Sequence, residues 1–315
     1  MDKRESFLLI LIASFFMLLM YVTGLTVNNR PAKVPAITTG VVETFGKEVE
    51  IILTGDVMLG RSVLIRTEKE RDWTYPFNKV SEYLRNSDIV FSNLESPIVE
   101  NCPRTDSGMV FCTDNKMTEG LKRANIGVVT VANNHMGNYG QKGINDTKRY
   151  LIGAGIDYTG VGDLVVKEVK GTKFGFLGFD FVNAKPTDLD LKLIRQSDSL
   201  VDVLIVGVHW GEEYKDKANK KQREIAKDLV ENGADVIAGH HSHWVQDTEK
   251  INQTSTKLRW ARPVYYSLGN FVFDQEWSEE TKKGLVIKLT FKDGELIKEE
   301  KLPIYISSLG QPEFR

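Results

Sequence analysis

The five histidines of this chain lie at the ends of segments that have the pattern of buried strands. They are His135, His209, His240, His241 and His243. Other ligand-type side chains end strand patterns in the same way, namely Asp56, Asn93, Glu95 and Asn134. In an open α/β sheet, ligands bind in the crevice beyond the carboxyl ends of the strands. Since imidazole and carboxylate together suit zinc, manganese or iron, these residues predict a divalent metal site.

Each of these residues also has a structural explanation when it is taken alone. Asp56 is placed to cap a following helix, and Asn134 and His135 suit a turn. Glu95 suits a solvated loop, and His209 suits a hydrogen-bonded position in the core. Independent structural residues have no reason to collect at successive strand ends, however, so the set as a whole favours one shared site.

Strands and helices alternate in the sequence pattern from Glu48 onward. Short apolar, β-branched runs indicate buried strands over residues 50–56, 88–95, 126–135, 173–181, 201–210 and 234–243. Amphipathic segments indicate helices over residues 78–86, 117–125, 143–155 and 220–232. This alternation predicts an α/β domain. His241 and His243 are alternate residues of the last strand pattern, so both rings are expected to face one site.

The C-terminal part has a different pattern. Residues 263–274 and 284–304 have strand patterns without helices between them. Asp293 and Gly294 form a dipeptide that is typical of a tight hairpin turn. The sequence therefore predicts antiparallel strands at this end of the domain.

The charge balance excludes a general affinity for polyanions. The 315 residues include 41 basic and 43 acidic side chains, which gives a net charge of −2. A nucleic-acid-binding protein normally carries a basic patch or an excess of positive charge. No nucleic-acid partner is therefore expected, and a charged substrate must be held by a local site.

The first segment predicts a membrane anchor. Residues 7–27 carry no charged side chain, and an apolar run of about 20 residues is long enough to span a bilayer as a helix. Lys3 and Arg4 precede it, so the positive-inside rule places residues 1–6 in the cytoplasm and the body of the protein outside. A cleavable signal peptide is the alternative, although its apolar core is normally shorter and no small-residue cleavage site follows the run.

These observations divide the chain into an anchor, a linker and one globular domain. Residues 28–47 contain Asn, Pro, Thr and Gly with little periodicity, which is typical of a linker. The domain is expected over residues 48–308, followed by a C-terminal tail over residues 309–315. The predicted location is the cell membrane, with a single span and an extracytoplasmic domain.

Cys102 and Cys112 lie close together in the sequence, in a stretch with a loop-like composition. In an oxidising compartment they are able to form a disulfide, and two unpaired thiols are the alternative. Their spacing matches no zinc-binding pattern, so a metal site at this pair is not expected.

Several ordered motifs make the chain resemble the CapA-type capsule synthesis or poly-γ-glutamate biosynthesis family. They are GDVMLGR (55–61), SNLESP (92–97), VANNHMGNYG (131–140), VHWGEEY (208–214), AGHHSHWVQ (238–246) and YSLGNFVFD (266–274). Their order of carboxylates, Asn-His, His and His-x-His is also similar to that of the calcineurin-like metallophosphatases. The resemblance implies a four-layer αββα sandwich with two mixed sheets between layers of helices.

The resemblance also implies roles for individual residues. Asp56 and His243 would bind one metal ion, and Asn134, His209 and His241 would bind a second. Glu95 would stand in the place of a bridging carboxylate. His135 would be a general acid that protonates a leaving group. Arg61 would grip an anionic group, and Glu212, Glu213, Tyr139 and Asn270 would line the cleft.

The chain departs from the metallophosphatase pattern at two positions. Met58 stands where the metallophosphatases have a histidine ligand, and a thioether is a poor substitute for imidazole. Glu95 replaces an aspartate, so its carboxylate reaches one methylene farther. The expected cofactor is therefore one or two ions of manganese, zinc or iron, and the departures favour one.

Two classes of function follow from the resemblance. The first is metal-assisted hydrolysis or transfer during the biosynthesis, transport or processing of an anionic polymer, poly-γ-glutamate, at a phosphoester or a γ-glutamyl amide. The second is a non-catalytic accessory subunit that binds polymer or metal beside a membrane synthase. A third reading keeps the fold and assigns a different extracellular substrate.

Overall fold

Two mixed β-sheets form the centre of the fold. The computed structural model describes residues 46–160, 162–252 and 260–315, and residues 46–315 belong to one compact unit. The predicted mixed α/β class is confirmed.

The first sheet has eight strands in the order β14-β13-β12-β1-β2-β3-β4, and β11 pairs with the end of β1. Its parallel half contains β1 (Glu48–Val57), β2 (Ile89–Leu94), β3 (Ile126–Thr130), β4 (Asp157–Thr159) and β11 (Asn270–Val272). Its antiparallel half adds β12 (Lys283–Lys292), β13 (Glu295–Ser308) and β14 (Gln311–Phe314).

The second sheet has six strands in the order β5-β6-β7-β8-β10-β9. These strands are β5 (Val165–Val169), β6 (Thr172–Asp180), β7 (Val203–His209), β8 (Val236–His240), β9 (Thr248–Ile251) and β10 (Arg262–Tyr265). The central strands β6, β7, β8 and β10 are parallel, so their carboxyl ends meet at one edge.

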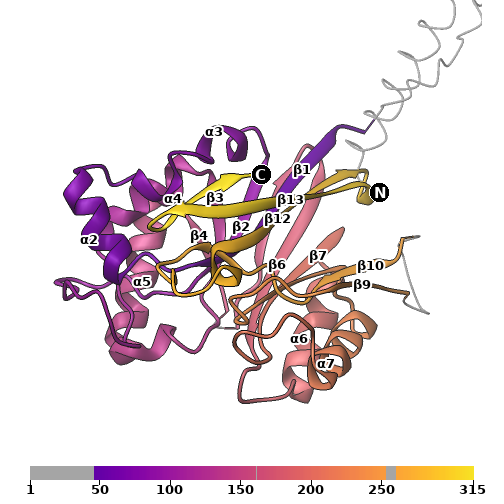
Figure 1. Cartoon of the computed structure of the whole chain (residues 1–315). Helices are drawn as coiled ribbons and strands as arrows, with labels where there is room; N and C mark the ends of the chain where they lie inside the picture. Colours follow the sequence, from indigo (N-terminus) through magenta and orange to yellow (C-terminus); the bar gives the residue numbers. More distant parts are fainter. Residues whose placement is uncertain (1–45, 161, 253–259) are drawn as a thin grey trace, which may run out of the picture. The chain divides into compact units, whose positions relative to one another are not determined.

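Alternation along the strands separates three layers of core. In β7, Val203 and Ile205 face the first sheet, whereas Leu204 and Val206 face the helices on the other side. The first sheet is covered by α2 (Arg61–Glu70), α3 (Ser81–Leu84), α4 (Thr118–Arg123) and α5 (Gly140–Ala154). The second sheet is covered by α6 (Asp188–Asp198) and α7 (Lys220–Glu231). The layers therefore follow the order helices, sheet, sheet, helices (Figure 1).

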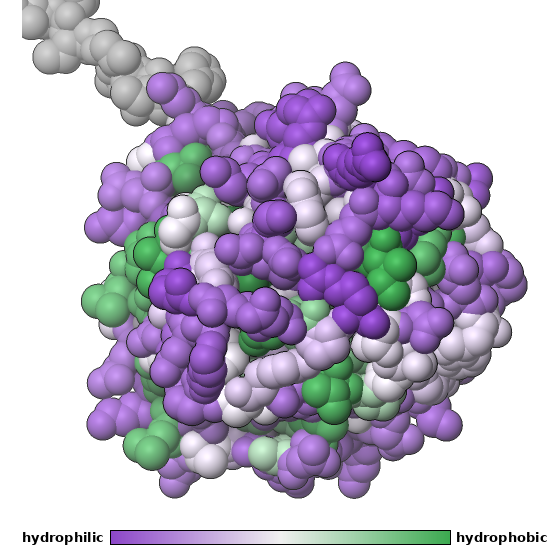
Figure 2. Space-filling view, turned by 90° about the vertical axis from the view of Figure 1, so that its left-hand side faces the viewer, coloured by the Kyte–Doolittle hydropathy of each residue, from purple (hydrophilic) through white to green (hydrophobic). Residues whose placement is uncertain are grey.

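Short 3₁₀ helices occur at the turns between these elements. They are η1 (Tyr75–Phe77), η2 (Asn115–Met117), η3 (Met136–Tyr139) and η4 (Glu280–Lys282). Of these, η3 directly follows His135 and leads into α5. The side of the molecule that carries α2 and α5 is mostly hydrophilic, with separate hydrophobic patches (Figure 2).

The C-terminal strands confirm the predicted hairpin and correct the predicted tail. Asp293 and Gly294 join β12 to β13 with φ angles of 53° and 79°, the left-handed pair that a tight two-residue turn requires. Residues 309–315, which we expected to be a tail, include β14. Ile304 and Ile306 of β13 pair with β14 and are buried, so this stretch belongs to the sheet.

The predicted anchor (7–27) and nearly all of the predicted linker (28–47) lie outside the described residues. Within the part of the chain that the structure describes, no helix has the length and apolar character of a membrane span.

Candidate metal centre

Register brings the ends of neighbouring strands to one place. Asp56 at the end of β1 pairs with Asn93 of β2 on one side and with Asn270 of β11 on the other. In the second sheet, His209 at the end of β7 pairs with His240 at the end of β8. Residues from opposite ends of the sequence therefore meet at the carboxyl edges of both sheets.

Glycines allow the backbone to approach closely beside these ends. A Cβ at Gly55 would lie 2.0 Å from the carbonyl oxygen of Gly269, and a Cβ at Gly239 would lie 2.1 Å from that of Tyr266. Since Gly55 precedes Asp56 and Gly239 precedes His240, any larger residue would push the site apart.

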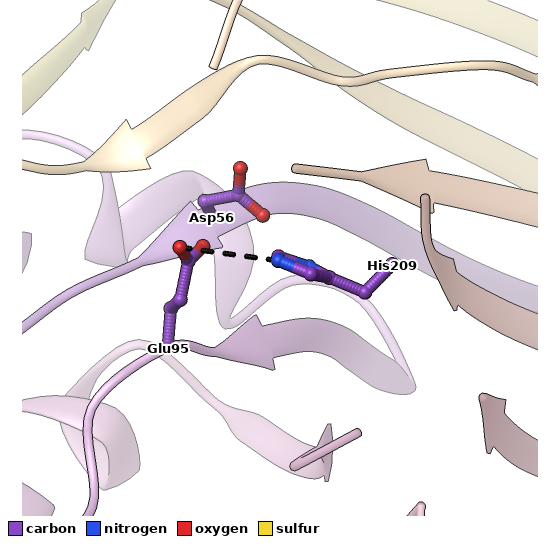
Figure 3. Close-up of side chains that lie close together, drawn as sticks. All are labelled: Asp56, Glu95 and His209. Atoms are coloured by element: carbon purple, nitrogen blue, oxygen red, sulfur yellow. Dashed lines mark ion pairs between the residues drawn. The ribbon is translucent and has the colours of Figure 1, made fainter. Parts of the chain in front are cut away.

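Asp56, Glu95 and His209 form the heart of the site. One ligand atom from each lies within 4.8 Å of the others, and all three side chains are buried. Figure 3 shows them pointing toward one another from β1, from the residue after β2 and from β7. Glu95 Oε1 lies 4.0 Å from His209 Nε2 and has no hydrogen-bond partner among the residues that the structure describes.

Two further atoms that could bind a metal ion lie beside His209 Nε2. Asn134 Oδ1 lies 3.0 Å away and His241 Nδ1 lies 3.1 Å away. Bonds of about 2.0–2.2 Å place the ligands of a tetrahedral ion about 3.3–3.6 Å apart. The distances from His209 Nε2 to Asn134 and His241 are slightly shorter than this range, and the 4.0 Å distance to Glu95 is slightly longer. Asn134 Oδ1 and His241 Nδ1 therefore lie close enough to His209 Nε2 to be ligands of the same divalent ion, and exposed Asn134 lies at the open side of the cluster.

The Asp56 carboxylate already has several close neighbours. Asn93 Nδ2 donates to Asp56 Oδ1 at 2.8 Å, and His240 Nδ1 lies 3.2 Å from the same oxygen. On the other oxygen, the His241 backbone N–H donates at 3.3 Å and His243 Nδ1 lies 3.3 Å away. Asp56 is therefore held by neighbours from both sheets.

The histidine pair reaches the site in a way that the strand pattern did not predict. Strand β8 ends at His240, so His241 and His243 are not alternate residues of an extended segment. Both have left-handed backbones, with φ angles of 91° and 57°. Such conformations cost about 1–3 kcal/mol each and persist where surrounding contacts enforce them. Here the turned backbone directs the His241 N–H to Asp56.

Burial and neighbouring charges shift the pKa values of the two carboxyl groups in opposite directions. Burial, together with the charges of Asp56 and Glu213, holds the pKa of Glu95 well above its usual value. Burial raises the pKa of Asp56, but His240 and His243 outweigh it and hold that pKa well below its usual value.

The imidazoles are shifted toward the neutral form that binds metals. Burial, followed by the proximity of His241, lowers the pKa of His209 well below its usual value. Burial, followed by the charge of His243, lowers the pKa of His241 to about 4. The neutral imidazoles of His209 and His241 are ligands that suit a divalent ion.

His135 lies at the edge of this cluster, under the loop that contains the two cysteines. Its Nε2 is 3.9 Å from Glu95 Oε1, and its ring stacks on Phe111 with the ring centres 3.9 Å apart. Its Nδ1 lies 3.2 Å from Asn138 Oδ1, which also accepts from the Phe111 backbone N–H at 2.6 Å. The side chain is 4% exposed, and burial is the main reason that its pKa is lowered.

The guanidinium of Arg61, which we predicted to bind an anionic group, is paired with protein groups in the structure. Its fork forms an ion pair with Asp274, and its Nη1 donates to the Gly108 carbonyl at 2.8 Å. The guanidinium also lies 4.6 Å from the centre of the Phe111 ring. Arg61 thus supports the wall of the site, and its partner Asp274 is too distant in the sequence for the motif to reveal it.

The other predicted cleft residues separate into different places. Glu213 acts on the cluster, since its charge raises the pKa of Glu95. Asn270 Oδ1 lies 3.0 Å from His243 Nδ1. Tyr139 lines a pocket of about 220 Å³ with Arg61 and the cysteine loop. Glu212 is exposed and accepts from Asn219 at the start of α7, and its place in the cleft stays a prediction.

Met58 packs in the core between the first sheet and its helices. It is fully buried, and its Sδ accepts from the Gly60 backbone N–H at 3.1 Å. The thioether is therefore used inside the fold, which agrees with its absence from the donor set.

Cys102 and Cys112 are joined by a disulfide in the structure. The bridge closes the loop that carries Phe111, and Tyr139 Oη lies 3.2 Å from Cys112 Sγ.

We expect thiol titration of the denatured, unreduced protein to find no free thiol. We also expect replacement of both cysteines by serine to lower the free energy of unfolding by about 3 kcal/mol, since a short cross-linked loop restricts the unfolded chain. Two reactive thiols in the native protein would contradict the pairing.

Asn93, Asn133 and His240 contribute contacts to the site for which no individual role was predicted. Asn93 and His240 were recognised at strand ends, and the structure places both against Asp56. Asn133 Nδ2 donates to Asn93 Oδ1 at 3.0 Å and to the Leu94 carbonyl at 2.9 Å. The only sequence signal for Asn133 is that it precedes Asn134 and His135.

Comparisons with known proteins agree with this arrangement. The model of the bacterial capsule synthesis protein family PGA_cap matches residues 50–275. The chain is 31% identical to "Capsule biosynthesis protein CapA" of Bacillus anthracis over 296 residues, which cover 85% of this chain and 69% of the relative. It is also 31% identical to "PGA biosynthesis protein CapA" of Bacillus subtilis over 270 residues, which cover 78% and 69%.

A solved structure is similar in fold. It is described as "Putative 5'-Nucleotidase from Staphylococcus aureus", with a TM-score of 0.50 and 13% sequence identity. The match covers 83% of this chain and 55% of that one. At this identity the likeness concerns the fold alone, and it supports the mixed α/β architecture with two sheets.

Proposed function

Because the chain belongs to the bacterial capsule synthesis protein family, we propose that it acts in the biosynthesis, transport or processing of an anionic capsule polymer, poly-γ-glutamate. The proposed activity is metal-dependent hydrolysis or transfer at a phosphoester or a γ-glutamyl amide. The observation that carries it is the set of ligand-type atoms around buried His209 Nε2, beside which Asn134, His241 and Glu95 lie.

The proposed division of labour follows from the contacts. Asn134, His209, His241 and Glu95 would hold a manganese, zinc or iron ion. When bound, such an ion supplies an activated water and polarises the oxygen under attack. Asp56 and His243 would complete the centre by holding the neighbouring side chains in place. His135 would give a proton from its ring to the departing group.

A direct test combines metal analysis with a substrate panel. The purified protein should retain a divalent ion, and its activity should be compared on phosphomonoesters, phosphodiesters and γ-glutamyl oligomers before and after chelation. Chelation should remove any turnover, and the same ion should restore it. Turnover that survives complete loss of the ion would exclude the metal-dependent reaction.

A second candidate is a non-catalytic accessory subunit that binds polymer or metal. The burial of His135 favours it, because the Phe111 ring covers the imidazole and a leaving group reaches the ring only if the cysteine loop moves. In this case the ion and the polymer would bind, but no member of the panel would be turned over.

We also propose that the domain is held on the outer face of the cell membrane, because Lys3 and Arg4 precede the uncharged run. The chain should sediment with membranes, and protease added outside the cell should cleave the domain while a cytoplasmic marker stays intact. Recovery of the full chain as a soluble cytoplasmic protein would refute this location.

A further inference from the structure

The carboxamide of Asn93 lies between the two acidic side chains of the centre. Asn93 is fully buried and stands opposite Asp56 in the register of β1 and β2. Its Nδ2 lies 2.8 Å from Asp56 Oδ1 and 3.2 Å from Glu95 Oε2. The same nitrogen lies 3.4 Å from His209 Nδ1, which is the longest of the three distances.

The contacts of Asn133 determine which end of the Asn93 amide faces the acids. Asn133 Oδ1 accepts from the backbone N–H groups of His135 and Met136 at 3.2 and 3.0 Å. Its Nδ2 donates to the carbonyl of Leu94 at 2.9 Å. Backbone groups have fixed donor and acceptor roles, so these contacts orient the Asn133 amide without ambiguity.

The orientation is passed on to Asn93. Asn133 Nδ2 also donates to Asn93 Oδ1 at 3.0 Å. The oxygen of Asn93 is therefore turned toward Asn133, and its two N–H groups are turned toward the carboxylates. The side-chain amide has two N–H donors, and both are used when one points to each carboxylate.

We propose that the Asn93 amide takes the place of a second cation between Asp56 and Glu95, that Asn133 holds it there, and that the centre consequently takes one metal ion. This proposal rests on the proposed metal-dependent function. Asn93 and Asn133 are positioning residues, because they act through the carboxylates.

The distribution of oxygen contacts supports a single ion. Asn93 uses Glu95 Oε2, which leaves Oε1 free and facing the imidazoles. The Nε2 atoms of His135, His209 and His243 lie 3.9, 4.0 and 3.8 Å from that free oxygen. In contrast, both oxygens of Asp56 have close N–H or imidazole neighbours. Of the four carboxylate oxygens of Asp56 and Glu95, Glu95 Oε1 is therefore the one without a hydrogen-bond partner among the described residues.

The test counts ions by calorimetric titration of the metal-free, full-length chain with Mn²⁺, without measuring activity. The unmodified chain should bind one ion. Asn93→Asp replaces the two donors by a third carboxylate, and that negative charge should admit a second ion. The Kd of this second ion in Asn93→Asp should be about tenfold or more lower than the Kd of any second ion on the unmodified chain. Changes of this size are typical for groups that contact metal ligands.

Asn133→Asp is a second variant, in which Asn93 itself is unchanged. It keeps the acceptors for His135 and Met136 but loses the donor to Asn93 Oδ1, so the Asn93 amide is free to turn its oxygen toward the acids. A second ion should bind here too, more weakly than in Asn93→Asp. Asn125→Asp is the matched control, since Asn125 donates to the Ser87 carbonyl at the opposite end of β3 and its loss should leave one ion.

Melting curves followed by circular dichroism establish that each variant is folded, and Asn133→Asp decides the question if Asn93→Asp does not fold. Two equally tight ions on the unmodified chain would overturn the role of Asn93 and leave the metal-dependent function standing. One ion with unchanged affinity in both variants would also overturn it. No ion on the unmodified chain would instead remove the proposed metal-dependent function itself.

Discussion

Replacement of His209 by alanine is expected to abolish tight binding of the metal ion. His209 Nε2 is the atom on which Asn134, His241 and Glu95 converge, so its removal deletes the centre of the donor set. Even groups that only contact metal ligands account for about 10–100-fold in affinity, so we expect a larger loss here. His241→Ala should have a similar effect. Metal analysis after dialysis, together with calorimetric titration, measures the change.

Asp180→Asn is the matched control for this prediction. Asp180 pairs with His209 across β6 and β7, at the same edge of the sheet, and its carboxylate accepts from the Val182 backbone N–H. The control should keep the ion. If His209→Ala and His241→Ala both retained it with unchanged affinity, the donor set would have to lie elsewhere.

His135→Ala is expected to reduce turnover roughly a hundredfold or more while leaving the metal content nearly intact, because the proposed role is proton transfer. The loss should be smaller for substrates with good leaving groups, since such groups need no proton. Misfolding would depress all substrates alike. Single-turnover rates over a series of leaving groups, measured with metal analysis, therefore test the role of His135.

Two outcomes would change the assignment of His135. Its Nε2 lies about as far from Glu95 Oε1 as those of His209 and His243, so loss of the ion in His135→Ala would make it a ligand. If His135→Ala supported polymer formation as well as the parent and His241→Ala did not, the ion would matter and proton transfer would not. The accessory-subunit function would then replace the enzyme.

The strand ends of this protein were predictable from the sequence because local patterns encode them. Apolar β-branched runs ended at Asp56 and His209, and the carboxyl ends of parallel strands meet at one edge. The Asp293–Gly294 hairpin was predictable for the same reason, because a two-residue turn requires residues that tolerate positive φ. These features depend on neighbours in the chain.

The strand pattern was less informative where a segment leaves the sheet. The pattern of the run that contains His240, His241 and His243 predicts one extended strand, but β8 ends at His240. The next residues take left-handed conformations that imidazole side chains do not predict. A hydrogen bond to Asp56 on the other sheet holds that backbone. Because this contact joins residues that are far apart in the chain, the local sequence pattern could not indicate it.

By itself, the sequence determined which residue types stand at the strand ends, and hence that a cation site was to be expected. Tertiary structure alone decided how those side chains are used. Arg61 pairs with Asp274, which lies 213 positions away in the sequence. Asn133, which follows β3, orients the amide of Asn93 on β2, and Asn93 then donates to one oxygen of Asp56 and one of Glu95. Hydrogen bonds depend on distance and direction in space, and the order of residues along the chain specifies neither until distant strands are paired in the sheet.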